Sequence, residues 1–165
     1  FRRVLFRSRA ADGRGPETML TRLVLRELGL REPRAMLSRI ESPAFERKDI
    51  AALARCVTRA AQRGDRVARS IQARGAAELA LCVATIVRKL AFGGGPIEVV
   101  MTGGVAESDP AYARKIQAAV RRAVPSVRWR TPVLAPIGGA ALIALRRAGI
   151  RIDAALLERL RAATS

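Results

Sequence analysis

Apolar residues recur every three or four positions along most of this chain, which is the spacing of one buried face of an α-helix. Asp65 and Asp109 stand just before two such stretches, where an aspartate side chain caps a helix. Gly29 and Gly149 stand just after two others, where glycine commonly ends a helix. The pattern predicts helices over residues 16–28, 33–40, 47–62, 66–90, 110–123 and 141–148, with a last helix after Asp153.

Two short segments depart from the helical spacing. Residues 97–101 are apolar apart from one glutamate and open into Thr102-Gly103-Gly104, and residues 127–130 form a second short strand. Strands that alternate with helices in this order are typical of an α/β unit with parallel strands. Two strands are too few for a complete sheet. We therefore expect a mainly helical body, a small parallel sheet covered on one side, and an exposed strand edge.

The longest predicted helix carries an apolar stripe and one of the two cysteines. Leu79, Val83, Ile86 and Leu90 alternate steps of four and three, which predicts the buried face of an amphipathic helix. Cys82 lies 26 residues after Cys56, without a C-x-x-C motif, and the chain has no histidine. A zinc site within the chain is therefore not expected. We interpret the cysteines as two buried thiols of a reducing, cytoplasmic environment.

Composition and charge add an alternative. Half of the residues are apolar but only 4% are aromatic, and the net charge is +17. Such a charge is typical of nucleic-acid-binding proteins, so a small basic helical nucleic-acid-binding protein is the alternative function. However, 28 of the 31 basic residues are arginines, scattered without interleaved aromatics, which indicates codon usage in a GC-rich genome. Salt-sensitive, non-specific adhesion to polyanions is expected in either case. No uncharged apolar stretch of 18 residues occurs, so we expect no membrane partner.

The first eight residues are interpreted separately. Residues 2–8, Arg-Arg-Val-Leu-Phe-Arg-Ser, read like a translated sequencing-library adapter. We therefore expect residues 1–8 to be such a scar and residues 9–165 to be the C-terminal part of a longer protein. The alternative is a basic N-terminal arm with a short apolar strand.

The chain contains none of the common catalytic motifs. It has no G-x-x-x-x-G-K-[ST], no G-x-S-x-G and no H-E-x-x-H. The feature most like a binding site is Gly103-Gly104, because a backbone without Cβ atoms lets a ligand approach closely at the carboxyl end of a parallel strand. Gly138-Gly139, at the start of a predicted helix, is similar. Taken alone, both pairs are equally typical of tight structural turns.

Several blocks of the chain, in order, resemble one family. The segment Ala11-Asp12-Gly13-Arg14-Gly15-Pro16-Glu17-Thr18-Met19-Leu20-Thr21 is similar to a D-G-R-G-P-x-T-x-L-T segment of bacterial N-acetylglucosamine-kinase-like proteins, which belong to the BadF/BadG-type ATPases of the actin, hexokinase and chaperone ATPase superfamily. The similarity runs from about residue 9 to 149. Its further blocks are residues 50–54, 61–65, 76–80, 99–105 and 136–142.

The resemblance implies an incomplete ribonuclease-H-like, actin-like ATPase domain at the C-terminal side of a two-domain enzyme. It implies that Gly103 and Gly104 pass beside the adenosine of ATP and that Ala51, at a helix start, lines the nucleotide pocket. The family's two phosphate loops, one of them like D-G-G-G-T, do not occur in this sequence. The carboxylate that binds the sugar is expected in the N-terminal half of the parent protein. Asp12 is not that carboxylate, because it belongs to a different motif. This chain is thus expected to contain no catalytic residue and no metal ligand.

The function implied is a fragment of an ATP-dependent kinase of an amino sugar, N-acetylglucosamine or glucosamine, that uses ATP and Mg²⁺ in the parent protein and is inactive alone. The resemblance leaves a homodimer of the parent open. A fragment of a related activator ATPase is a further alternative. Those ATPases bind an iron–sulfur cluster between subunits through cysteines. Here Cys56 and Cys82 fall inside predicted helices, which favours the sugar-kinase branch.

Overall fold

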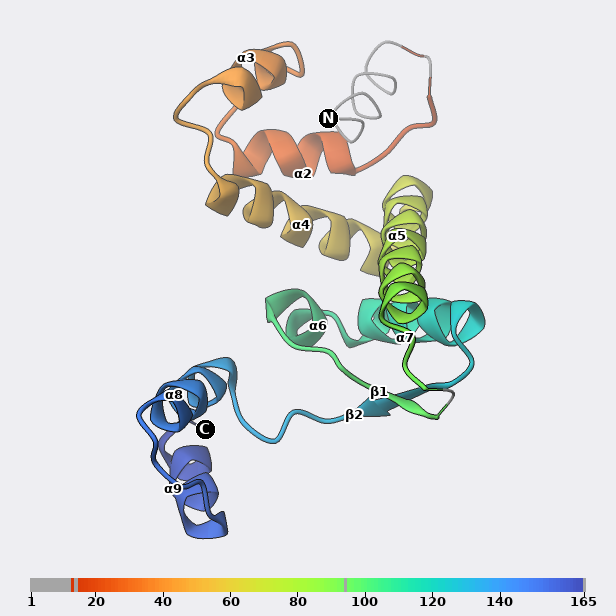
Figure 1. The fold of residues 1–165 in the computed structure, drawn as a ribbon. Helices are drawn as coiled ribbons and strands as arrows, with labels where there is room; N and C mark the ends of the chain where they lie inside the picture. Colours follow the sequence, from red (N-terminus) through yellow and green to blue (C-terminus); the bar gives the residue numbers. More distant parts are fainter. Residues whose placement is uncertain (1–12, 14, 94, 165) are drawn as a thin grey trace.

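The computed structural model describes residue 13 and residues 15–93 and 95–164, so the adapter-like residues 1–8 lie outside the described part of the chain (Figure 1). Its body is mainly helical. The elements in chain order are α2 (Leu20–Glu27), α3 (Ala35–Glu41), α4 (Arg47–Gln62), α5 (Arg66–Leu90), β1 (Ile97–Val100), α6 (Gly104–Ser108), α7 (Pro110–Ala123), β2 (Val127–Arg130), α8 (Pro136–Arg147) and α9 (Ala154–Thr164).

The two strands form the parallel pair that the sequence predicts. β1 and β2 pair in register from Ile97 opposite Val127 to Val100 opposite Arg130. Alternate residues of both strands, such as Val99 and Trp129, pack against the cluster formed by α5 and α7. The opposite face is exposed and carries an ion pair in which the Arg130 Nε donates to Glu98 Oε1 at 2.8 Å. A sheet of two strands leaves an open outer edge on each, as expected for such a sheet.

The contact between α5 and α7 forms the largest core cluster. Ala76 and Ala80 of α5 pack against Ile116, Ala119 and Val120 of α7. Small residues allow the two helices to approach closely: a Cβ added at Gly75 would overlap the Tyr112 hydroxyl oxygen.

The prediction that the apolar stripe of α5 is its buried face is therefore wrong. Leu79, Ile86 and Leu90 are 46, 53 and 63% exposed, and only Val83 is partly buried. The helix is amphipathic, but α7 covers the line of alanines beside the stripe, because that side permits the closer approach. The prediction of two buried thiols is confirmed for Cys56, which lies in the core of the first helices. It is wrong for Cys82, which lies on the uncovered side of α5 and is exposed.

α5 is also the one helix in the described residues that is long and apolar enough, by length and composition, to cross a membrane. Its most apolar 18-residue window has a mean hydropathy of 1.3, and 17% of that window is buried. Core helices of soluble proteins pass the same test but are mostly buried, whereas α5 packs on α4 and α7 and leaves most of this window uncovered among the described residues. The expectation of no membrane partner stays a prediction.

Aspartate caps join the helices to one another. Asp65 caps α5 by accepting from the Ala68 amide at 2.8 Å, and it also accepts from the Thr18 hydroxyl and the Met19 amide at the start of α2. Asp109, only 1% exposed, caps α7 through the Tyr112 amide. Asp65 thus also fixes the start of α2, and Asp109 also accepts a hydrogen bond from the Gln72 side chain of α5.

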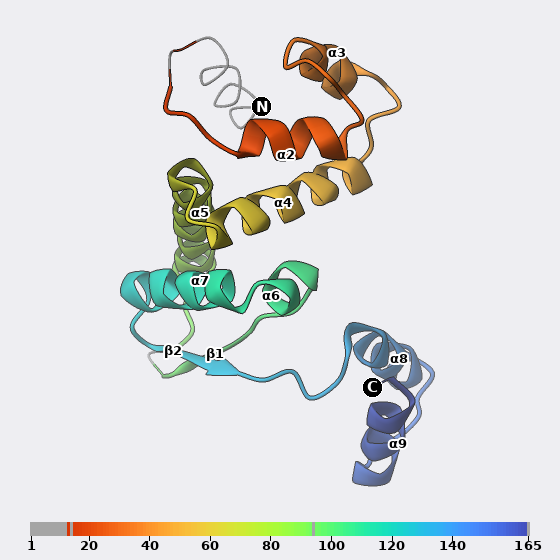
Figure 2. The ribbon, with the colours of Figure 1, turned by 180° about the vertical axis from the view of Figure 1, so that it is seen from behind.

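The structure differs from the predicted elements near the glycine pairs. α6 was not predicted, and α8 begins at Pro136 rather than at residue 141. Proline fits the first turn of a helix, because the amide it lacks would have no partner there. α8 packs chiefly on α9, and Figures 1 and 2 show this pair set apart from the other helices, beyond the end of β2.

Candidate functional site

Gly103 and Gly104 lie just beyond the carboxyl end of β1. Gly103 has φ of +105°, a conformation that strains any residue with a side chain, and Gly104 is the first residue of α6. The Gly103 amide donates to Glu107 Oε1 at 3.3 Å, so the Glu107 side chain reaches back from α6 to the turn. A Cβ added at either glycine would meet no atom within 4 Å. The turn therefore presents bare backbone to open space.

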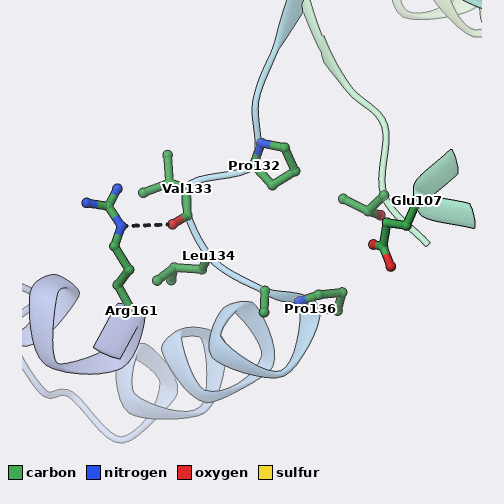
Figure 3. A pocket seen from close by; sticks show the side chains of 8 residues that line it. Glu107, Pro132, Val133, Leu134, Pro136 and Arg161 are labelled. Carbon is green, nitrogen blue, oxygen red and sulfur yellow. Dashed lines mark hydrogen bonds between the residues drawn. The ribbon is translucent and has the colours of Figure 1, made fainter. Parts of the chain in front are cut away.

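A cavity of about 240 Å³ adjoins this turn. Thr102 and Glu107, on either side of the glycine pair, form one wall. The segment 132–136, which leads from β2 into α8, forms the floor and the facing wall, and Arg161 of α9 closes one side. Figure 3 shows Glu107 and Arg161 on opposite sides of the cavity, with the rings of Pro132 and Pro136 between them.

Arg161 connects the last helix to the cavity wall. Its Nε donates to the Val133 carbonyl oxygen at 3.3 Å (Figure 3). Its Nη1 lies 3.0 Å from Glu158 Oε1. The side chain is thereby held at the edge of the cavity by the segment that forms its floor.

Sequence reasoning missed both charged residues of this cavity. Glu107 follows the glycine pair by three residues, so a search of the residues after the turn would have found it. Arg161 has no distinguishing signal in a chain with 28 arginines, because only folding brings it to the segment 132–136.

The remaining predicted site residues lie at different places. Gly138 is buried in the first turn of α8, two residues after Pro136 of the cavity wall. Ala51 is exposed in the first turns of α4 and is not among the residues that line the cavity. Both glycine pairs thus lie next to residues that line the cavity, although none of the four glycines lines it, and the role of Ala51 stays a prediction.

The arrangement suits binding more than chemistry. Flat apolar surfaces between a carboxylate, a hydroxyl and a guanidinium fit a heterocycle with polar edges. The described residues contain no group of three or more aspartate, glutamate or cysteine side chains that could hold a metal ion.

Comparison with known protein families identifies the family of this chain. The model of the BadF/BadG/BcrA/BcrD ATPase family matches residues 2–144, which is most of the chain and includes both glycine pairs. The chain therefore belongs to this family of ATP-binding, actin-like ATPases, and its helical body with two parallel strands is consistent with part of that fold. α9, with Arg161, lies after the matched region. None of the curated proteins matches the chain.

Proposed function

We propose that this member of the BadF/BadG/BcrA/BcrD ATPase family forms the adenosine-binding side of a cytoplasmic, ATP-dependent amino-sugar kinase. N-acetylglucosamine or glucosamine is the substrate class, and the remainder of the enzyme supplies the phosphate loops, the Mg²⁺ ligands and the carboxylate that accepts the proton of the sugar hydroxyl. The sugar assignment rests on the ordered sequence blocks described above.

The position of Gly103 and Gly104 carries the adenosine part of the proposal. Ligands of α/β sheets bind beyond the carboxyl ends of the strands, and the glycine pair occupies that place. The bare backbone lets a nucleoside approach, the apolar segment 132–136 offers a surface for the base, and the Glu107 carboxylate can accept hydrogen bonds from ribose hydroxyls. A cavity of about 240 Å³ is smaller than the roughly 300–1,000 Å³ of most ligand sites. We therefore assign to this cavity only the nucleoside part of ATP and not the triphosphate.

The triphosphate and the sugar need residues that this sequence does not contain. Phosphoryl transfer depends almost wholly on positioning and on charge stabilisation of the transferred group. No D-G-G-G-T-like loop occurs in the 165 residues, and Glu107 is bonded to the adenosine-side turn.

We therefore expect the purified chain to phosphorylate neither N-acetylglucosamine nor glucosamine with ATP and Mg²⁺, while it still binds adenosine weakly and saturably. The measurement is the sugar phosphate formed over hours, with an intact family kinase as the positive control, together with an adenosine titration followed by NMR. Sugar phosphate formed by the chain alone would contradict the proposal that the remainder of the enzyme supplies the phosphate loops and the sugar-binding carboxylate. An absence of adenosine binding would contradict the site.

A further inference from the structure

A second hollow lies along α2, at the edge of a core cluster against which two of its lining residues, Leu25 and Leu30, pack. It is formed by the way this helix ends. Gly29, with φ of +66°, follows the last residue of the helical end. The Leu30 amide donates to the Leu25 carbonyl at 2.8 Å and the Gly29 amide donates to the Arg26 carbonyl at 3.3 Å. This pair of bonds is a Schellman motif, in which the chain folds back along the helix it has just left. Arg31 is thereby returned to the side of α2.

Three arginines meet at this hollow. Arg22 and Arg26 are four residues apart and so share one face of α2, and the returning chain adds Arg31 beside them. The hollow has a volume of about 420 Å³, with Leu25 and Leu30 among the residues that line it. No carboxylate is among its lining residues in the described part of the chain.

The nearest acid in the α2 sequence is directed elsewhere. Glu27 lies on the other side of the helix, where its Oε1 is 3.1 Å from Arg55 Nη2 of α4. Three guanidinium groups are therefore gathered without a protein counter-charge among the described lining residues, an arrangement that an anion would stabilise.

The hollow stands on a fixed part of the fold. Leu20 and Val24, on the opposite face of α2, are fully buried in the two clusters that join this helix to α4 and α5. The start of the helix is held by Asp65, which accepts from the Met19 amide and the Thr18 hydroxyl at 2.8 and 2.9 Å. Thr18 and Thr21 also line the hollow. The arginines thus extend from a rigid base, which lowers the entropy lost when they close on a ligand.

We propose that Arg22, Arg26 and Arg31 form a binding site for a small phosphorylated metabolite that carries at least two negative charges. Planar guanidinium groups pair with phosphate oxygens in a two-pronged geometry, the Thr21 hydroxyl adds a neutral donor, and the leucines accept the apolar part of the ligand. The site is separate from the adenosine cavity: no residue lines both.

Inorganic pyrophosphate is the probe for this site, measured by isothermal titration calorimetry on the whole chain. We expect saturable binding with one pyrophosphate per chain. The double variant R26Q/R31Q should weaken it by about tenfold or more, because two charge-assisted contacts are lost. The matched control is R146Q/R147Q in the last turn of α8. It also removes two positive charges, but away from the hollow, and it should change the affinity for pyrophosphate by less than about twofold.

The control distinguishes a site from general attraction by a basic surface. If both double variants weaken binding equally, or if wild type shows no saturation, the positive charge of the whole chain is responsible and the proposal is wrong. The same holds if a single-stranded RNA binds but pyrophosphate does not displace it. A Gly29→Val variant tests the geometry with the charges unchanged: strain at a positive φ should disturb the return of Arg31 and weaken pyrophosphate binding. Unchanged affinity in that variant would also overturn the proposal.

Discussion

Replacement of Asp109 by alanine is expected to lower the free energy of unfolding by about 2–4 kcal/mol. The change removes the cap of α7, which costs roughly 1 kcal/mol. It also removes the acceptor of the Gln72 side-chain amide, 2.8 Å away and 5% exposed, and an unpaired buried donor costs about 1–3 kcal/mol. Gln72 in turn accepts from Lys115 Nζ at 3.0 Å, so the variant disturbs a chain of bonds between α5 and α7. Urea unfolding followed by circular dichroism measures the difference.

Asp153→Ala is the matched control for Asp109→Ala. Asp153 caps α9 in the same way, through the Leu156 amide at 2.8 Å, but it is exposed and bonds no buried group among the described residues. Its loss should cost about 1 kcal/mol or less. If the two variants lower stability equally, the buried network adds nothing to the cap.

Gly104→Val is expected to raise the KM for ATP by about tenfold or more in an intact homologue, with the KM for the sugar nearly unchanged. The branched side chain would fill the space through which the nucleoside approaches. The added Cβ itself would contact nothing in the free protein, since no atom lies within 4 Å of it. The loss should therefore come from the ligand and not from misfolding. Steady-state kinetics at varied ATP and at varied sugar separate the two constants.

Gly139→Val provides the comparison for the nucleotide prediction. Like Gly104, Gly139 lies in a helix and belongs to a glycine pair, and a Cβ added there also meets no atom within 4 Å. A valine there should cost a similar, small amount of helix stability. It should leave the KM for ATP within about twofold, because Gly139 lies inside α8, three residues after Pro136 of the cavity wall, and not at the carboxyl end of β1. An unchanged KM for ATP in Gly104→Val, or equal effects of the two variants, would contradict adenosine binding at the Gly103-Gly104 turn and leave it with a structural role alone.

Local sequence determined the elements of this protein. The spans of α4, α5, α7 and β2 agree with those predicted from spacing and caps, because helix periodicity and an aspartate cap act within a few residues of each other. The parallel pairing of the strands also followed from element order, since a helix between two adjacent strands returns the chain to the same end of the sheet. α6 escaped prediction because a helix of five residues has too few positions to show a period.

Tertiary contacts decided which faces are covered and which distant residues meet. In α5 both the leucine stripe and the alanine line are apolar, so hydrophobicity alone could not choose between them; the close approach of α7 selected Ala76 and Ala80 and left Leu79 and Cys82 exposed. The cavity beside Gly103 is a similar case. The glycines next to it were visible in the sequence, but Arg161 reaches the cavity only because α9 folds back on α8 and bonds to the segment before α8. Such contacts depend on the paths of chain segments that lie far apart in the sequence, and local spacing carries no information about those paths.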